Sequence, residues 1–257
     1  MTIGTNKFQS IASLHGEQAL EALRHAHVMI VGIGGVGSWA AEIAARSGIG
    51  RLTLVDPDEI CISNTNRQIH TTNSNIGKSK AVEMQQRITS FHPECEIRTI
   101  ETFYSKDTHS QIFDANVDFV IDAIDDAKAK ATLIHHCKET NLPAVVVGSA
   151  GGVEDPAKIK ISDLNRAYND PLLARVRKIL RREHTFPGPN IDYGMTCVFS
   201  FEKGRIDTSC QTQSDPLFGN SKLNCNSGYG SAGYITGSMG FYAAGIAINH
   251  LVKPKKK

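Results

Sequence analysis

The sequence predicts an α/β fold in which helices cover both faces of a doubly wound, mostly parallel β-sheet. From about residue 27 to residue 150, apolar runs of strand length alternate with segments of helical spacing. This alternation is typical of parallel strands joined by crossover helices. Residues 151–257 follow a less regular pattern, so we expect an irregular α+β extension there. Residues 1–257 are expected to form a single domain with these two halves.

The composition is that of an ordinary soluble globular protein. Hydrophobic residues make up 40% of the chain and charged residues 21%, which is typical of a single large domain with a substantial core. The net charge of +2 is too small to indicate nucleic-acid binding by itself. Polar and charged positions occur throughout the first twenty residues, so we expect no secretory signal and a cytoplasmic protein.

The first expected strand, residues 27–31, leads through a glycine-rich turn into a helix over residues 38–47. The turn contains Gly32, Gly34, Gly35 and Gly37, of which the first, second and last have the G-x-G-x-x-G spacing. In this order they allow a tight turn, let the backbone approach a phosphate, and let helix and strand pack closely. The helix start also favours an anion. The motif predicts a Rossmann-like, nucleotide-binding half over residues 27–150.

The second expected strand, residues 51–55, ends in Asp56, with Asp58 just beyond. An acid at this position accepts hydrogen bonds from the ribose hydroxyls of a bound nucleotide. The rule applies to NAD and ATP equally, and a solvated strand end is the alternative interpretation of Asp58. The turn and the acids therefore predict a nucleotide without deciding which one.

Two fixed positive charges distinguish the nucleotides, Arg67 in a polar stretch and Lys80 at the start of the next expected helix. Arg67 offers a planar fork and Lys80 a compact point charge for phosphate oxygens. Both can neutralise the charge that shifts when an α-phosphate is attacked and pyrophosphate leaves. A hydride-donating cofactor does not need them, so ATP is favoured and a nicotinamide dehydrogenase ranks last. The stretch contributes the candidate ATP contacts Ser63, Asn64, Asn66, Arg67 and Gln68.

The fourth expected strand, residues 118–121, is followed by Asp122, Asp125 and Asp126. A carboxylate at the carboxyl end of such a strand can hold Mg²⁺, which prefers oxygen ligands and substrate phosphates. Taken singly, each of these acids suits a surface position. Together with the two cations they predict an MgATP site.

The motifs GIGGVGSW, LVDPDEICISNTNRQ, IGKSKA and DFVIDAIDD resemble the ATP-binding motifs of the ThiF, MoeB and HesA family, relatives of ubiquitin-activating enzymes. The resemblance implies adenylate-forming chemistry and a homodimer. Its implied site residues are Asp56 for the ribose, Ser63, Asn64 and Arg67 for the nucleotide, Lys80 for the phosphates and Asp125 for magnesium. The resemblance further implies that Arg67, Lys80 and Asp125 are catalytic. It also implies that Asp126 is a further ATP contact.

Further segments resemble one branch of that family, the bacterial tRNA threonylcarbamoyladenosine dehydratases. They are FQSIASLHGEQAL, NTNRQIH, AGG at 150–152, DPLLARVR and NCNSGYG, so the resemblance spans nearly the whole chain. It implies that a threonyl carboxylate next to a tRNA anticodon is adenylated and that ring closure then removes one water. The ring product, the tRNAs used and the need for a sulfur-transfer protein stay open.

Three departures from the family pattern are expected to matter. Asp126 stands where members often have asparagine, and Lys7 stands near an arginine that crosses to the partner's ATP site in dimeric relatives. A lysine there offers only a point charge. The cysteines at positions 61, 95, 137, 197, 210 and 225 contain no C-x-x-C pair, so we expect no zinc site. Cys225 is either a reactive thiol or a small buried hydrophobe.

Two basic segments are candidates for contact with tRNA. Arg175, Arg177, Lys178, Arg181 and Arg182 crowd one expected helix, Leu172–Arg182, and Lys253, Lys255, Lys256 and Lys257 end the chain. Such clusters bind phosphate backbones, although a solvated helix face and a disordered tail are the alternatives. The tail also allows loose membrane association.

The last expected helix, residues 234–252, is long enough and apolar enough to imitate a membrane span. Its glycines suit close packing in a protein core, so we expect no integral insertion. Two rival functions remain: activation of the C-terminus of a ubiquitin-like sulfur carrier, and a non-catalytic scaffold in a sulfur relay. The missing zinc pairs disfavour the first, and the intact Arg67, Lys80 and Asp125 disfavour the second.

Overall fold

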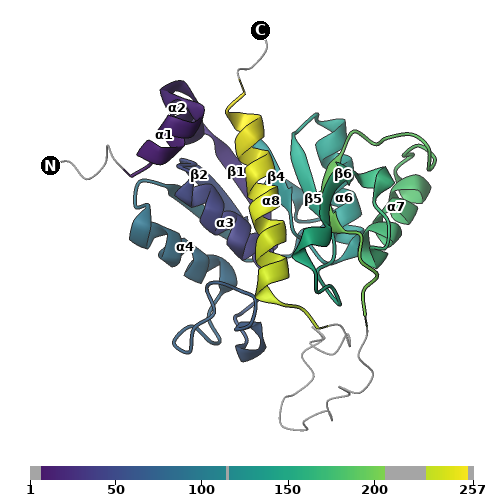
Figure 1. Ribbon diagram of the computed structural model, residues 1–257, viewed down its shortest axis with the longest axis horizontal. Helices are drawn as coiled ribbons and strands as arrows, with labels where there is room; N and C mark the ends of the chain where they lie inside the picture. The colour runs from purple at the N-terminus through teal and green to yellow at the C-terminus, as the bar shows by residue number, and fades with distance from the viewer. Residues whose placement is uncertain (1–6, 114–115, 206–229, 254–257) are drawn as a thin grey trace, which may run out of the picture.

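A central β-sheet of seven strands dominates the computed structural model, which describes residues 7–113, 116–205 and 230–253 (Figure 1). The strands are β1 (His27–Val31), β2 (Arg51–Val55), β3 (Glu96–Ile100), β4 (Phe119–Asp122), β5 (Ala144–Val147), β6 (Ile159–Asp163) and β7 (Thr196–Ser200). Their order is β3-β2-β1-β4-β5-β7-β6, and every neighbouring pair is parallel except β6 with β7. The predicted doubly wound, mostly parallel sheet is confirmed.

Helices cover both faces of this sheet (Figure 1). They are α1 (Gln9–His15), α2 (Glu17–His25), α3 (Gly37–Arg46), α4 (Lys80–Phe91), α5 (His109–Ile112), α6 (Ala127–Glu139), α7 (Pro171–Glu183) and α8 (Gly233–Leu251), with short 3₁₀ turns η1 (Ile62–Asn64), η2 (Pro156–Lys158) and η3 (Leu164–Arg166). One apolar core joins α3, α4 and α8 to the sheet, and a second joins α6 and α7 to the opposite face. Each buried strand therefore contributes to two cores, which explains the continuous apolar runs of β1 and β5.

Residues after position 150 are more regular than the sequence suggested. β7 pairs in parallel with β5, and β6 adds an antiparallel edge strand, so both halves of the chain share one sheet. Helix α8 packs against α3, where Gly240 lies so close to the α3 turn that an added Cβ would stand 2.6 Å from Val36 O. Gly237 and Gly240 thus face α3 in close helix packing, whereas a Cβ on Gly245 would meet no atom within 4 Å. Among the described helices, none combines the length and apolarity that a bilayer crossing requires.

Candidate active site

The glycine turn between β1 and α3 is sterically closed on one side and open on the other. Gly32 has φ +92°, and a Cβ there would lie 2.7 Å from Ala123 O in the turn after β4. A Cβ on Gly37 would overlap Gly32 O. Gly34 is different, because a Cβ there would meet only Gln68 Nε2 at 3.9 Å. Gly34 therefore presents backbone to open space, as a turn that receives a phosphate requires.

Asp56 follows β2 directly and is 5% exposed. Its Oδ2 accepts a hydrogen bond from Ile33 N at 2.6 Å, and its Oδ1 accepts one from Asp58 N at 2.9 Å. Burial raises the pKa of Asp56, and the charge of Lys80 opposes that shift. The carboxylate therefore ties the acid loop to the glycine turn. Each oxygen keeps a lone pair that a ribose hydroxyl could use.

Lys80 opens α4, and its Nζ donates a hydrogen bond to Asp58 Oδ2 at 2.7 Å. The side chain of Lys80 is 9% exposed and that of Asp58 is 27% exposed, so the pair lies at the wall of the site rather than in free solvent. Ser79 caps α4 by accepting from Val82 N. An ammonium has three donors, so Lys80 can hold Asp58 and still reach a phosphate.

The polar stretch that the sequence singled out forms the turn η1 and the loop after it. Asn64 is buried, and its Oδ1 accepts from Cys61 N at 2.9 Å, which makes it a structural cap of η1. Gln68 is also buried and lies beside Gly34. Its Oε1 has no hydrogen-bond partner among the described residues. An unsatisfied buried amide at the open turn fits a site that a polar ligand completes.

Arg67 is partly exposed, and local contacts orient its side chain. Its Nη1 donates to Ser63 O at 2.8 Å and to Asn66 Oδ1 at 2.9 Å. Its carbonyl oxygen accepts from Trp39 Nε1 at 3.0 Å, which links the loop to α3. Asn66 in turn donates to Ser231 O at 2.7 Å, so this loop also contacts the segment that leads into α8.

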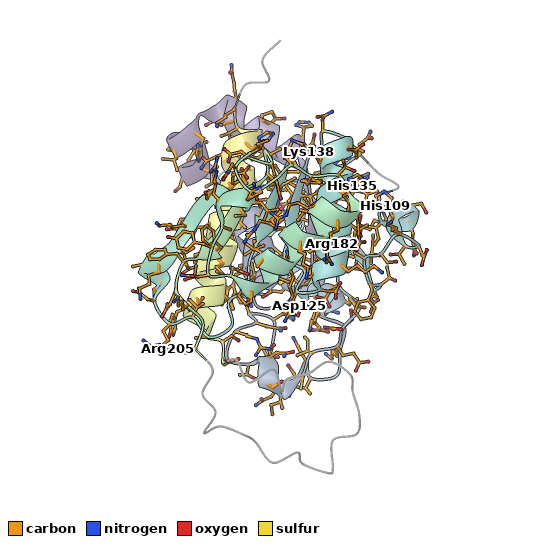
Figure 2. The ribbon with its side chains drawn as sticks, turned by 90° about the vertical axis from the view of Figure 1, so that its right-hand side faces the viewer. His109, Asp125, His135, Lys138, Arg182 and Arg205 are labelled. Carbon is orange, nitrogen blue, oxygen red and sulfur yellow. The ribbon has the colours of Figure 1, made fainter. Side chains whose placement is uncertain are left out.

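Asp122 is the last residue of β4, and the two acids that follow the strand take separate positions. Asp125 is exposed beyond the end of the strand, at the N-terminal end of α6 in Figure 2. Asp126 is the N-cap of α6, because its Oδ1 accepts from Lys128 N at 3.0 Å and Ala129 N at 2.7 Å. Its visible contacts are structural, whereas Asp125 remains open to solvent and to a cation.

Asp122 and Lys130 form a fully buried ion pair that sequence reasoning missed. Their side chains are 1% and 0% exposed, and Lys130 Nζ lies 2.8 Å from Asp122 Oδ1. The same oxygen accepts from Ile124 N at 3.1 Å. Burial raises the pKa of Asp122, and Lys130 counteracts the rise. The pair fixes the turn that carries Asp125. Its sequence signal is a lysine at helical spacing with Ile134 and Cys137 on a buried face.

The basic residues of α7 do not share one surface. Arg175, Lys178, Arg181 and Arg182 are exposed, and Arg182 points outward from α7 in Figure 2. Arg177 is half-buried and donates from Nη1 to Leu164 O at 3.3 Å. The helix begins with Asp170 as N-cap, which accepts from Leu173 N at 2.9 Å and Ser149 N at 2.8 Å. An Asp-Pro pair before an apolar run was the available signal for that cap.

The remaining candidates are only partly visible. Lys7 pairs with Glu94 of its own chain at 2.9 Å. Cys225, Cys210 and the last three lysines lie outside the described residues. Within the part of the chain that the structure describes, no three His, Cys, Asp or Glu side chains gather as metal ligands. Cys61 is exposed, and Cys95, Cys137 and Cys197 are buried free thiols.

Known proteins are similar to this chain in sequence and in fold. The model of the ThiF family matches residues 8–154. The tRNA threonylcarbamoyladenosine dehydratase of Haemophilus influenzae is 40% identical over 253 residues, which are 97% of this chain and 94% of that protein. The crystal structure of the Escherichia coli tRNA N6-threonylcarbamoyladenosine dehydratase in complex with ATP has a TM-score of 0.86 at 37% identity and covers 98% of this chain and 96% of its own. The sulfur carrier protein ThiS adenylyltransferase of E. coli is 30% identical over 139 residues, 54% of each chain.

Proposed function

The chain belongs to the ThiF family, and from this premise we propose that it dehydrates threonylcarbamoyladenosine in tRNA in an ATP-dependent reaction. One observation carries the proposal: similarity to a dehydratase of this kind extends along nearly the whole of both chains. The ATP-bound relative supports ATP as the nucleotide. The open backbone at Gly34, the unsatisfied amide of Gln68 and the cations nearby suit the same ligand.

The proposed chemistry starts at the threonyl carboxylate of the substrate. One carboxylate oxygen attacks the α-phosphate of ATP, pyrophosphate leaves, and the mixed anhydride with AMP turns a poor leaving group into a good one. A nucleophilic atom of the same carbamoyl side chain then attacks the carbonyl carbon and AMP departs. One water is lost overall. Because the second attack is intramolecular, positioning and exclusion of bulk water contribute most of the rate.

Three side chains have proposed roles in adenylation. Arg67 and Lys80 neutralise the phosphate oxygens as charge moves onto pyrophosphate. Lys80 is already held by Asp58, and Arg67 by Ser63 and Asn66, so neither side chain needs much reorganisation. Asp125 would hold Mg²⁺, which would neutralise further phosphate charge. Asp56 would accept hydrogen bonds from the ribose.

The proposed partners are tRNA and a second copy of the chain. The exposed cations of α7, Arg175, Lys178, Arg181 and Arg182, would contact the phosphate backbone. Tyr234, Phe241 and Tyr242 expose an aromatic stripe on α8, 60%, 46% and 44% exposed, that suits a homodimer interface. We place the protein in the cytoplasm with its substrate. A sulfur-transfer protein would be an accessory, since loss of water needs no sulfur.

Mass spectrometry of nucleosides tests this function. We incubate tRNA carrying threonylcarbamoyladenosine with the protein and MgATP, and expect a product lighter by one water together with AMP. Arg67→Ala should abolish the change while its thermal melt stays close to that of the wild type. An unmodified nucleoside, with pyrophosphate exchange only after addition of a ubiquitin-like sulfur carrier, would transfer the assignment to sulfur-carrier activation.

A further inference from the structure

A pocket of about 360 Å³ with polar and apolar lining opens at the carboxyl ends of β5 and β7. Its lining includes Ser149 after β5, Ser200 at the end of β7, Asn169 and Arg177. We call it the β5–β7 pocket. Because β1, β4, β5 and β7 are neighbours and parallel, their carboxyl ends share one edge of the sheet. The pocket therefore lies on the same edge as the glycine turn, in the position where such sheets bind ligands.

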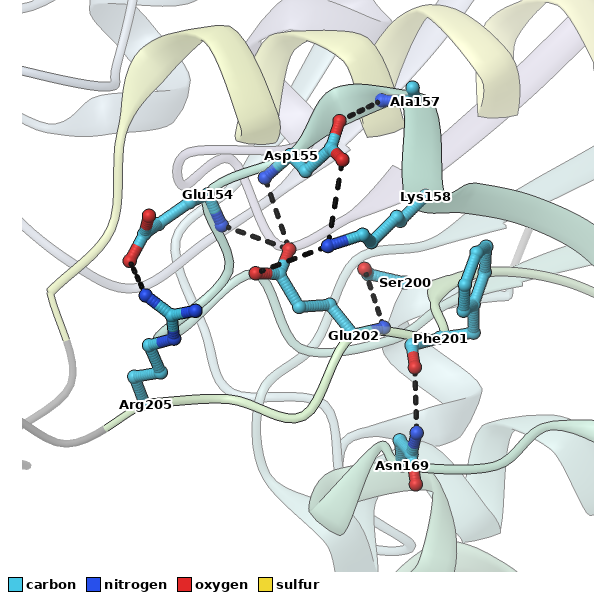
Figure 3. A network of polar contacts seen from close by, with 9 residues as sticks. All are labelled: Glu154, Asp155, Ala157, Lys158, Asn169, Ser200, Phe201, Glu202 and Arg205. Carbon is cyan, nitrogen blue, oxygen red and sulfur yellow. Dashed lines mark hydrogen bonds and ion pairs between the residues drawn. The ribbon is translucent and has the colours of Figure 1, made fainter.

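Hydrogen bonds fix the walls of this pocket (Figure 3). Glu202, after β7, accepts from Asp155 N at 3.0 Å and Glu154 N at 3.3 Å and lies 3.9 Å from Lys158 Nζ. On the other side, Asn169 Nδ2 donates to Phe201 O at 2.6 Å. The segment after β7 is thereby tied to two separate loops. A pocket with such walls is formed before its ligand arrives.

The lining of the β5–β7 pocket carries two acids and two cations, and its unused hydrogen-bonding groups belong mainly to the cations. Of its two acids, Asp170 accepts from two backbone amides as the cap of α7, and Glu202 accepts from two more. The cations are Arg177 and Lys203. Arg177 makes one hydrogen bond among the described residues, to Leu164 O, so most of its N–H donors are unused. Burial, followed by the charge of Arg181, lowers the pKa of Arg177, and both costs would fall if an anion bound beside it.

The side chains that line the pocket indicate which group of a tRNA it would bind: a base, the threonyl carboxylate or a backbone phosphate. Recognition of a base depends largely on aromatic stacking, and the described residues that line the pocket include no aromatic side chain. The threonyl carboxylate must reach the α-phosphate at the glycine turn. With strands ~4.8 Å apart, that turn lies roughly 12 Å from the pocket. A nucleotide whose base carries an amino-acid side chain extends far enough to place its carboxylate at one point and its backbone phosphate at the other.

We propose that the β5–β7 pocket binds a backbone phosphate that flanks the modified adenosine, with Arg177 and Lys203 as its ligands. This proposal rests on the proposed function, and it separates Arg177 from the exposed cations of α7. The latter attract tRNA without regard to register. Arg177 instead sets the distance between the bound phosphate and the site where the carboxylate reacts. It is a positioning residue for adenylation.

Neutral phosphates test the proposal. Anticodon stem-loop RNAs carrying threonylcarbamoyladenosine are made with one methylphosphonate, either 5′ or 3′ to the modified nucleotide or in the distal stem. We measure kcat/KM with MgATP and RNA affinity without ATP. The wild type should lose roughly 10- to 100-fold in kcat/KM at one flanking position, the range for a charge-assisted hydrogen bond. Arg177→Gln should show a loss of the same size with the RNA that has no methylphosphonate. The flanking methylphosphonate should then cause no further loss in this variant.

Matched variants complete the design. Arg177→Lys keeps the positive charge but lacks the planar guanidinium fork, so its kcat/KM should lie between those of the wild type and Arg177→Gln. Arg175→Gln removes an equal charge from the same helix and should stay as sensitive to the flanking methylphosphonate as the wild type. Lys203→Gln, at an exposed position, serves if Arg177→Gln melts early. Equal sensitivity of the wild type, Arg177→Gln and Lys203→Gln at both flanking positions would overturn the proposal. Absence of dehydration by the wild type would contradict the proposed function instead. The RNA affinities measured without ATP would still show whether the effects of Arg177→Gln and of the flanking methylphosphonate depend on each other.

Discussion

Lys80 Nζ lies 2.7 Å from Asp58 Oδ2, so the lysine proposed for the phosphates is already held by an acid in the same site. The acid is itself held, because Asp58 N donates to the buried carboxylate of Asp56. These contacts form one chain from the strand end to the start of α4. They orient the charge of Lys80 before any nucleotide binds, which reduces the reorganisation that adenylation requires.

We predict that Lys80→Met raises the Kd for MgATP roughly 10- to 100-fold, since a charge-assisted hydrogen bond to phosphate is lost. Asp58→Asn keeps the shape of the acid but removes its charge. We therefore expect Asp58→Asn to lower the rate of ATP–pyrophosphate exchange less than Lys80→Met does. Calorimetric titration and exchange assays measure the two effects. Exchange by Lys80→Met at the wild-type rate would exclude this lysine from the phosphate site.

We predict that substitution of Asp126 affects mainly stability, whereas substitution of Asp125 affects mainly the magnesium requirement. Asp126→Ala removes an N-cap and should lower the free energy of unfolding by about 1 kcal/mol, with a smaller effect on turnover. Asp125→Ala should leave the melt close to that of the wild type and raise the Mg²⁺ concentration needed for half-maximal adenylation. Urea unfolding and magnesium titrations give the two readouts. An unchanged magnesium midpoint in Asp125→Ala would remove the proposed metal role.

The buried Asp122–Lys130 pair predicts a large stability effect. Lys130→Met leaves the carboxylate of Asp122 buried without its partner and should cost about 3–5 kcal/mol of unfolding free energy. Adding Asp122→Asn removes the orphaned charge and keeps an oxygen for Ile124 N, so the double variant should recover part of the loss. A double variant less stable than Lys130→Met would show that charge pairing is not what the site requires.

His70 predicts an acid-dependent loss of stability. Burial, followed by the charges of Lys80 and Arg87, lowers the pKa of His70 from 6.5 to about 4 in the folded protein. Above pH 6.5 the ring is neutral in both states. As the pH falls from there toward 4, the unfolded chain binds a proton that the folded chain does not, so the free energy of unfolding falls by up to about 3 kcal/mol.

Substitution of His70 should make the free energy of unfolding less dependent on pH. Both ring nitrogens of His70 lack hydrogen-bond partners among the described residues, so His70→Leu sacrifices no polar contact seen there. We expect the variant to lose less stability than the wild type between pH 7 and pH 4.5 in urea unfolding. His25→Gln, at a surface position where the side chain is 77% exposed and lies beside Glu21, is the matched control and should follow the wild type. Parallel profiles for all three proteins would refute the assignment.

The elements of the nucleotide half were accessible to sequence reasoning because their local signals agree. β1 and β2 have the expected bounds, and α3 begins and ends within one residue of the expected helix, as does α8 outside this half. Apolar runs, glycines and helix spacing all point to the same structure in this part. The edge strand β6 was missed because only the first residue of Ile159–Asp163 is buried, and the segment becomes a strand only by pairing with β7.

The sequence names the candidate site residues but does not indicate the contacts among them. The sequence placed Lys80 and Asp58 in one site, yet nothing in their spacing indicated that they form an ion pair. Lys130 was missed because lysine is rarely buried, and its partner Asp122 looked like one more acid at a strand end. Arg177 was grouped with its exposed neighbours because sequence adjacency does not show which face of α7 meets η3.

The central claim is that the substrate carboxylate itself attacks ATP, and oxygen labelling tests it most directly. The protein is given tRNA whose threonylcarbamoyladenosine carries ¹⁸O in both carboxylate oxygens, with unlabelled MgATP. Adenylation followed by ring closure transfers one labelled oxygen to AMP, and we predict singly labelled AMP in an amount equal to the dehydrated nucleoside. Unlabelled AMP, or ADP with labelled phosphate, would contradict attack of the carboxylate on the α-phosphate.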